Sequence, residues 1–227
     1  MYKRQASGKA HRINVIMPIL YGGRQHRRTY RESLDCAVAL QELASMGVQN
    51  IITFDAHDPR VQNAIPLTGF DNIMPSYQVL KAMMKTFDNL NFDKKHFMIV
   101  SPDEGAINRN MYYASVLGVD LGMFYKRRDY STVVNGRNPI VAHEYMGNDV
   151  TGKDIFIADD LISSGESMLD IAIELKKRNA GKIFCYATYG IFTNGLESFN
   201  KAYADGIIDA VFGLSLIHIS EPTRHLR

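Results

Sequence analysis

The stretch "IFIADDLISSGES", residues 155–167, places two adjacent carboxylates directly after four consecutive apolar residues. A continuous apolar run of this kind is typical of a strand that is buried on both faces of a parallel sheet. A turn of serine and glycine follows, and an amphipathic segment begins after it. We therefore predict a buried strand that ends at Asp159 and Asp160, followed by a small-residue loop that opens a helix.

The same alternation of short apolar runs and longer amphipathic segments recurs along the chain. Strands are predicted at 13–18, 50–55, 97–102, 121–125, 154–159 and 182–188. Segments with apolar residues at helical spacing lie between them, at 33–46, 77–87, 104–117, 165–179 and 196–205. Strands that alternate with helices predict an α/β fold with doubly wound, mostly parallel sheets.

The composition is typical of an ordinary soluble globular protein. With 227 residues, 46% of them hydrophobic, the chain is long enough for one or two domains with a sizeable core. Its apolar runs are shorter than the roughly 20 residues that span a bilayer. The two cysteines, Cys36 and Cys185, match no metal-ligand spacing and are interpreted as reduced thiols. We expect a cytoplasmic protein that binds neither membrane nor zinc.

Both ends of the chain resemble foreign sequence. "MYKRQ" at residues 1–5 and "LSLIHISEPTR" at 214–224 resemble the translated ends of a common transposase sequencing adapter. We therefore leave residues 1–5 and 214–227 out of the fold prediction and interpret 6–213 as a fragment of a longer protein. Without these ends the formal net charge of +2 becomes slightly negative, so charge gives no support to nucleic-acid binding.

The opening stretch has the chemistry of a sugar-phosphate site. A serine- and glycine-rich turn at the start of a helix directs backbone N–H groups and hydroxyls toward one point, where they can bind a phosphate. Asp159 and Asp160 could accept hydrogen bonds from vicinal sugar hydroxyls or hold Mg²⁺. Together these groups indicate a pentose 5-phosphate. The alternative is a capped helix beside two solvated aspartates.

Polar residues also follow the other predicted strands, where ligands bind in parallel α/β sheets. They include Arg24 and Gln25, then Asp55 and His57, then Asp103, and finally Lys126 and Arg128. Taken singly, each has a simpler interpretation: a basic surface turn for "GRQHRR" and "KRR", and a structural histidine for His57.

The segment "DDLISSGES" resembles the signature of phosphoribosyltransferase-type folds, two acidic residues followed by a loop that binds ribose 5-phosphate. It departs from the usual form at Ser163, Glu166 and Ser167, and Glu166 places a negative charge near the expected phosphate. Further motifs appear in the order found in the ribose-phosphate diphosphokinase (PRPP synthetase) family. They are "PILYGGRQHRR" (18–28), "ITFDAHDPRVQ" (52–62), "VSPDEGAINR" (100–109), "YKRRD" (125–129) and "YGIFTNG" (189–195).

This resemblance implies a domain organisation and an activity. It implies two similar phosphoribosyltransferase-like lobes, an incomplete one at 6–75 and a truncated one at 76–213. The implied reaction moves the diphosphoryl group of ATP to the anomeric hydroxyl of ribose 5-phosphate and releases AMP. The resemblance also implies Mg²⁺ and a homo-oligomeric parent protein. We expect the present fragment to show little or no activity by itself.

The resemblance assigns roles residue by residue. ATP binding is implied for Arg24, Gln25 and His57, and metal binding for His57, Asp103 and Asp55. Catalytic roles are implied for Lys126, Arg128 and His57. The segment 129–144, which contains the polar, turn-rich stretch "YSTVVNGRNP" (130–139), is predicted to be a closing lid. Ribose 5-phosphate binding is implied for the opening stretch, with residues Asp159, Asp160, Ser163, Ser164, Gly165, Glu166 and Ser167.

Two other functions use the same fold. A base phosphoribosyltransferase would share "DDLISSGES" but has no need for Arg24, His57 and Lys126 together. A catalytically silent regulatory subunit should have lost the loop lysine and arginine or the metal-side histidine. Tyr189, where the family usually has histidine, keeps this second alternative open.

Overall fold

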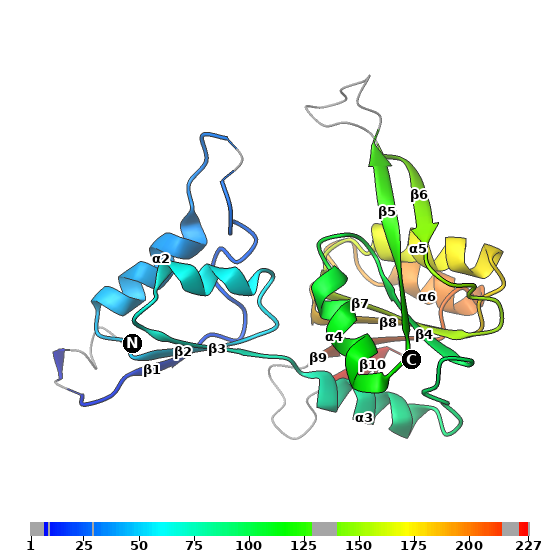
Figure 1. Cartoon of the computed structure of the whole chain (residues 1–227), viewed down its shortest axis with the longest axis horizontal. Coiled ribbons are helices and arrows are strands. Elements are labelled where there is room, and N and C mark those ends of the chain that lie inside the picture. Colours follow the sequence, from blue (N-terminus) through cyan, green and yellow to red (C-terminus); the bar gives the residue numbers. More distant parts are fainter. Residues whose placement is uncertain (1–6, 9, 29, 129–139, 215–222, 227) are drawn as a thin grey trace. The chain divides into compact units, whose positions relative to one another are not determined.

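The computed structural model describes residues 7, 8, 10–28, 30–128, 140–214 and 223–226, with backbone only for 126–128, 140–143 and 223–226. The chain divides into two compact units, Met1–Pro75 and Ser76–Arg227. Their elements are labelled in Figure 1.

The first unit is a small three-stranded parallel sheet. Its strands β1 (Asn14–Ile16), β2 (Asn50–Phe54) and β3 (Gly69–Ile73) lie in that order. Helix α2 (Asp35–Ser45) and the 3-10 helix η1 (Pro59–Ala64) connect them. The core is formed by apolar residues from the sheet and α2, among them Ile51, Leu40 and Leu43.

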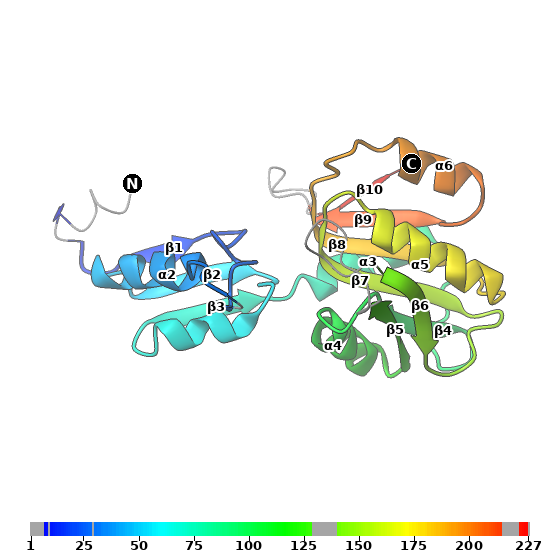
Figure 2. The same ribbon diagram turned by 90° about the horizontal axis from the view of Figure 1, so that it is seen from above.

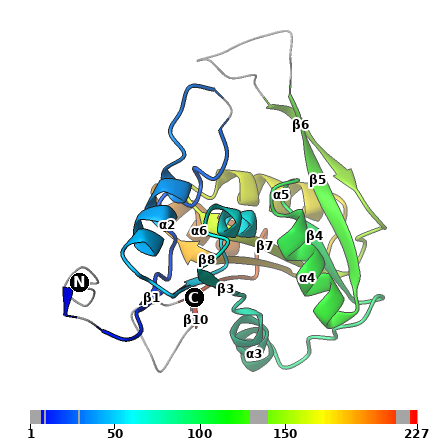
Figure 3. The same cartoon turned by 60° about the vertical axis from the view of Figure 1, so that its left-hand side comes forward.

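The second unit contains a seven-stranded sheet with helices between the strands. The strands are β4 (Phe97–Ser101), β5 (Asp120–Arg128), β6 (Ile140–Met146), β7 (Asp154–Ile162), β8 (Ile183–Gly190), β9 (Ala210–Leu214) and β10 (Thr223–Leu226). The helices are α3 (Ser76–Thr86), α4 (Ile107–Leu117), α5 (Glu166–Lys177) and α6 (Glu197–Ala204). β5 and β6 form an antiparallel pair that extends beyond the rest of the sheet (Figure 3).

The strand order of this sheet places a topological switch point between β4 and β7. The order is β10-β9-β8-β7-β4-β5-β6, and the pairs from β9 through β5 are parallel. From β4 the chain continues through α4 to β5 on one side, whereas β7 leads to β8 and β9 on the other (Figure 2). Ligands bind in the crevice at such a switch point, beyond the carboxyl ends of the strands.

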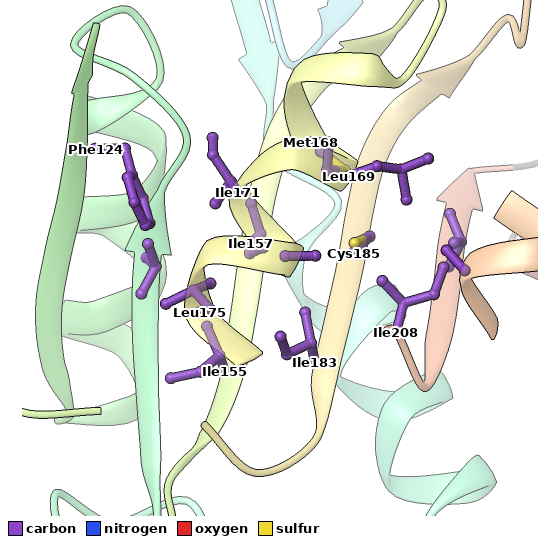
Figure 4. Close-up of a cluster of buried hydrophobic side chains, with 14 of the residues drawn as sticks. Phe124, Ile155, Ile157, Met168, Leu169, Ile171, Leu175, Ile183, Cys185 and Ile208 are labelled. Carbon is purple, nitrogen blue, oxygen red and sulfur yellow. The ribbon is translucent and has the colours of Figure 1, made fainter. Parts of the chain in front are cut away.

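Helices cover both faces of the central strands. On one face, Ile171 and Leu175 of α5 pack with Ile155, Ile157 and neighbouring residues of the sheet (Figure 4). On the other face, the ring of Tyr113 from α4 lies 5.3 Å from the ring of Phe156. Coverage on both faces explains why β4 and the first half of β7 are continuous apolar runs.

The α/β class and the mostly parallel sheets are confirmed, and each predicted strand and helix is present. The predicted strand ranges do not include β3, β6 and β9. β3, "GFDNI", is an edge strand with exposed alternate positions and contains glycine, aspartate and asparagine, which are depleted in strands. β6 lies antiparallel to β5, and the alternation of strands and helices that predicts parallel strands does not predict a strand of this kind. Of the lid predicted at 129–144, residues 129–139 lie outside the described residues, and 140–144 belong to β6.

The C-terminal segment that resembles adapter sequence includes β10. It pairs antiparallel with β9, with Thr223 opposite Leu214 and Leu226 opposite Val211. A foreign origin for this segment stays a prediction. Within the described ranges, the structure has no helix that is long and apolar enough to cross a membrane.

The core of the second unit predicts a position-specific cost of truncation on α5. Ile171→Ala removes a fully buried side chain and should lower the free energy of unfolding by about 2–4 kcal/mol. Ile173→Ala is the matched control, since Ile173 on the same helix is 38% exposed, and it should cost less than about 1 kcal/mol. Urea denaturation measures both, and equal losses would contradict the described packing.

Candidate functional site

The paired carboxylates lie at the carboxyl end of β7, as predicted, beside the switch point. The Asp159 side chain is 28% exposed and the Asp160 side chain 9% exposed. The Asp160 N–H donates to Oδ1 of Asp159 at 2.8 Å, which holds the first carboxylate against the backbone of the second residue. Two like charges in so little solvent require a nearby cation.

Arg109 on α4 supplies that cation. Its side chain is only 7% exposed, with Nη1 3.5 Å from Oδ1 of Asp159 and Nη2 3.9 Å from Oδ1 of Asp160. One guanidinium therefore contacts both carboxylates and places them in a defined relation to α4. The sequence analysis quoted Arg109 within "VSPDEGAINR" but assigned it no role, because a charged helical residue ordinarily faces solvent.

Burial and the proximity of Asp160 raise the pKa of Asp159 to about 7, although Arg109 acts in the opposite direction. Burial is the larger cause, since it disfavours the charged form, and the neighbouring carboxylate adds to it. A carboxyl of this kind can lose its proton within the physiological range, so its charge responds to a ligand or cation that binds nearby.

Asp103 lies just beyond the carboxyl end of β4, on the other side of the switch point. Its Oδ1 accepts a hydrogen bond from the Ala106 N–H at 3.1 Å, and its carbonyl oxygen accepts one from Oγ of Ser101 at 2.8 Å. These bonds fix the turn between β4 and α4, and the carboxylate remains half-buried.

The predicted phosphate loop connects β7 to α5. Gly165 occupies the N-cap position of α5 with φ of +83°, a conformation that favours glycine. Since glycine has no side chain with which to cap the helix, the first-turn N–H groups depend on Oγ of Ser164, 3.5 Å from the Glu166 nitrogen, or on water or a bound anion. The Ser163 carbonyl accepts from the Thr193 N–H at 3.0 Å, which anchors the loop.

The side chains of this loop are accessible. Ser163, Glu166 and Ser167 are exposed, and Ser164 and Gly165 are half-buried. Glu166 is the first residue of α5, where a negative charge interacts favourably with the helix dipole. This interaction explains why a glutamate is tolerated at position 166, which the comparison of motifs did not explain.

The first unit contains the other predicted residues. Arg24 is exposed, and the half-buried Gln25 donates a short hydrogen bond from Nε2 to Glu32. Asp55 is 2% exposed and has φ of +40°, a backbone conformation that costs energy outside glycine and is frequent at functional sites. His57 is half-buried at the carboxyl side of β2.

An ion pair joins the two motifs of the first unit. Nδ1 of His26, which follows Gln25, lies 2.8 Å from Oδ2 of Asp58, which follows His57. The rings of His26 and His57 are in edge contact, with centroids 5.2 Å apart. Hydrogen bonds from Arg60 are the main reason that the pKa of Asp58 falls to about 2. The sequence analysis missed His26 and Asp58, whose pairing only the fold reveals.

Some predicted residues are described only in part. Lys126 and Arg128 lie in β5, and their side chains are outside the described part of the structure. Asp55 and His57 belong to the first unit and Asp103 to the second, so each part of the predicted metal set is described by itself. Within the described residues, three or more His, Cys, Asp or Glu side chains nowhere gather as a metal-binding group would.

Comparison with known proteins identifies the family. The phosphoribosyl transferase domain family matches residues 69–212, more than half of the chain. The chain belongs to this family. The domain match includes Asp103, the Asp159–Asp160 pair and the loop before α5, whereas the candidate residues of the first unit precede it.

Curated relatives of this phosphoribosyl transferase domain protein are ribose-phosphate pyrophosphokinases, another name for the predicted diphosphokinases. The Ureaplasma parvum protein is 29% identical over 92% of the chain, and the Ralstonia nicotianae protein is 31% identical over 89%. The chain spans 59% of the length of each. These relatives confirm the resemblance predicted from the motifs.

A solved structure supports the fold. Phosphoribosylpyrophosphate synthetase from Mycobacterium smegmatis superposes with a TM-score of 0.77, at 21% identity, over 97% of this chain and 68% of that one. At this identity the likeness concerns the fold alone, and it agrees with the α/β architecture.

The raised pKa of Asp159 predicts a pH-dependent stability. The folded carboxyl keeps its proton between pH 3.8 and about 7, where the unfolded carboxyl has lost it, so Asp159 contributes most to stability at low pH. This contribution declines as pH rises toward 7. The side chain in Asp159→Asn cannot titrate. The free energy of unfolding of this variant should therefore rise by roughly 2–4 kcal/mol relative to that of the wild type between pH 4 and pH 7. Parallel unfolding free energies for the two proteins across this range would contradict the shift.

The geometry of the phosphate loop predicts that Gly165→Ala is costly. A Cβ at this position would lie 2.3 Å from ring carbons of the buried Phe199. Gly152→Ala is the matched control, because Gly152 has φ of +70° and its Cβ would meet no described atom within 4 Å. We expect a loss of about 1 kcal/mol for Gly152→Ala and of about 2–4 kcal/mol for Gly165→Ala, measured by urea denaturation. Similar losses would mean that the contact with Phe199 does not shape the loop.

Proposed function

We propose that the chain is part of a ribose-phosphate diphosphokinase, which transfers the diphosphoryl group of ATP to ribose 5-phosphate and yields 5-phosphoribosyl 1-diphosphate and AMP. The observation that carries this proposal is the arrangement at the end of β7, where two carboxylates held by Arg109 precede, by a short loop, a helix N-terminus with Gly165 at its N-cap position. The curated relatives support the choice of this reaction over others on the same fold.

The second unit would bind ribose 5-phosphate. The loop Ser163–Ser167 presents N–H groups and hydroxyls at the start of α5, which suits the doubly charged 5-phosphate. Asp159 and Asp160 would accept hydrogen bonds from the ribose hydroxyls, because an ionised carboxylate is an acceptor only. Their attachment to Arg109 limits their movement and so orients the sugar.

The first unit would bind ATP. The planar fork of an arginine such as Arg24 pairs with phosphate oxygens and stacks on bases, and Gln25 offers an amide beside it. His57 follows the buried Asp55 and is held by edge contact with His26. The His26–Asp58 ion pair keeps the loop that carries Arg24 and Gln25 next to the loop that carries His57.

Mg²⁺ fits the donors present. Asp103 offers a half-buried carboxylate at a strand end, and Mg²⁺ is ordinarily held by one or two carboxylates together with substrate phosphates. In the second unit Asp103 would be a ligand, directly or through water. In the first unit His57 is the more accessible of the two predicted ligands, since Asp55 is 2% exposed. When bound, Mg²⁺ would neutralise charge on the triphosphate.

The transfer requires little covalent chemistry from the protein. The anomeric oxygen of ribose 5-phosphate forms a bond to the β-phosphorus of ATP and loses its proton. The bond between the β-phosphorus and the oxygen that links it to the α-phosphate breaks, and AMP leaves. Lys126 and Arg128 would stabilise the negative charge on the moving group. A polar segment at 130–139 would close over it as a lid.

The experiment that tests this function is an assay of the full-length parent protein with ribose 5-phosphate, ATP and Mg²⁺. We expect AMP and 5-phosphoribosyl 1-diphosphate as products. ADP would indicate transfer of one phosphoryl group and would contradict the proposal. Formation of a nucleotide and diphosphate from a free base and 5-phosphoribosyl 1-diphosphate, in a separate assay, would favour a base phosphoribosyltransferase. The absence of any turnover in both assays would favour a regulatory subunit.

Lys126 provides the sharpest mutational test. Lys126→Ala should lower the rate of AMP formation about 10²–10⁴-fold, since one preorganised positive charge at the transferred group is lost. The folded state should remain, as judged by thermal unfolding. Lys201→Ala, at an exposed position of α6, is the matched control and should retain full activity. Unchanged turnover in Lys126→Ala would remove this residue from the mechanism.

Cytoplasmic location, assembly as a homo-oligomer and low activity of the 227-residue chain stay predictions. The ordinary globular composition supports the cytoplasmic location. The chain spans 59% of the length of the first two relatives, which supports the low activity.

A further inference from the structure

The ladder between β4 and β7 ends at Ile157, two residues before Asp159. Its last described pair is Val100 with Ile157. Within β7, the Asp154 N–H points toward β4 and donates to the His96 carbonyl at 2.8 Å, whereas the Ile155 N–H points away, to Lys182. Because strand residues alternate in this way, the main-chain groups of Ala158 also point toward β4.

The side chain of Asn110 supplies a donor that β4 cannot provide at this point. In the register of the ladder, the Ala158 carbonyl would accept from residue 102, but Pro102 has no N–H. Nδ2 of Asn110 donates to this carbonyl at 2.8 Å, and its Oδ1 accepts from the Ala158 N–H at 3.2 Å. Asn110 belongs to α4 and is completely buried.

The same amide also contacts the end of β4. Nδ2 of Asn110 lies 3.2 Å from Oγ of Ser101 and 2.9 Å from the Ala106 carbonyl. The Ser101 hydroxyl in turn donates to the carbonyl of Asp103 at 2.8 Å. A continuous chain of hydrogen bonds therefore links the residue before Asp159 to the backbone of Asp103, across the switch point.

We propose that Asn110 is a positioning residue of the ribose 5-phosphate site, which inserts its amide between the ends of β4 and β7 and so sets the separation of Asp103 from the Asp159–Asp160 pair. This role rests on the proposed function, which gives ribose 5-phosphate as the ligand of the site. The ladder cannot continue by direct pairing at this point, because its next donor would come from Pro102, which has no N–H. The amide of Asn110 supplies this donor from α4, so the strand ends are held through Asn110 without leaving a buried carbonyl unsatisfied.

The chemistry of the position requires an amide. Alanine would leave the Ala158 carbonyl without its side-chain donor, and Pro102 has no N–H to replace it, so the end of β7 would shift or a buried acceptor would stay unsatisfied. Aspartate has the same shape, but it only accepts when ionised and would add a third negative charge near Asp159 and Asp160. Both substitutions should therefore displace the carboxylates, for different reasons.

The test uses the 227-residue chain and calorimetric titration with ribose 5-phosphate and, separately, with ATP. Asn110→Ala and Asn110→Asp should each raise the Kd for ribose 5-phosphate at least tenfold and change the Kd for ATP less than twofold. Asn108→Ala is the matched control, because Asn108 is an exposed asparagine on the same helix. Its affinities should equal those of the wild type. In the full-length parent, the KM for ribose 5-phosphate should rise while the KM for ATP stays unchanged.

A purely structural role would lower thermal stability in Asn110→Ala and leave ribose 5-phosphate affinity within twofold of wild type, which would overturn the proposal. Ser101→Ala removes only the second step of the hydrogen-bond chain and serves if the Asn110 variants do not fold. It should raise the same Kd about three- to tenfold, and an unchanged Kd would also overturn the proposal. If the wild type itself does not bind ribose 5-phosphate, the proposed function fails first, and the positioning role fails with it.

Discussion

Two carboxylates at the end of a buried strand, held by one buried guanidinium, constrain the rest of the second unit. Arg109 favours the ionised form of this pair, since burial and the neighbouring carboxylate already raise the pKa of Asp159 and an unpaired buried charge is costly. Arg109 in turn must come from α4, so α4 has to lie across the ends of β4 and β7. The adjacent Asn110 then satisfies the backbone where the two strands separate. Residues 109 and 110 together let the sheet present acidic groups at its switch point.

The two units divide the proposed chemistry between them. The second unit offers acceptors for sugar hydroxyls next to a helix N-terminus that suits a phosphate. The first unit offers an exposed arginine, an amide and a histidine on two loops that are joined by the His26–Asp58 ion pair. In each unit, residues outside the recognisable motifs hold the motif residues in place. Substitutions at these supporting positions should therefore affect one substrate more than the other.

The sequence predicted the fold class because long apolar runs and amphipathic helices are strong, local signals. The edge strand β3 was missed because its residues alternate in exposure and favour turns. Asn110 had a signal that could have been found: Ala106, Asn110, Tyr113 and Leu117 recur at helical spacing, and Asn110 is the one polar member of this inward stripe. The His26–Asp58 pair had no such signal, because its partners come from loops that only the tertiary fold brings together.

The most direct test of the account is a titration of the isotope-labelled chain with ribose 5-phosphate, followed by the backbone amide resonances. The account predicts saturable shifts centred on residues 159–167, with smaller shifts in α4, at sugar phosphate concentrations where ribose without phosphate has no effect. Resonances that stay unmoved in 159–167, or that shift only in another part of the chain, would contradict the assignment of this strand end as the sugar-phosphate site.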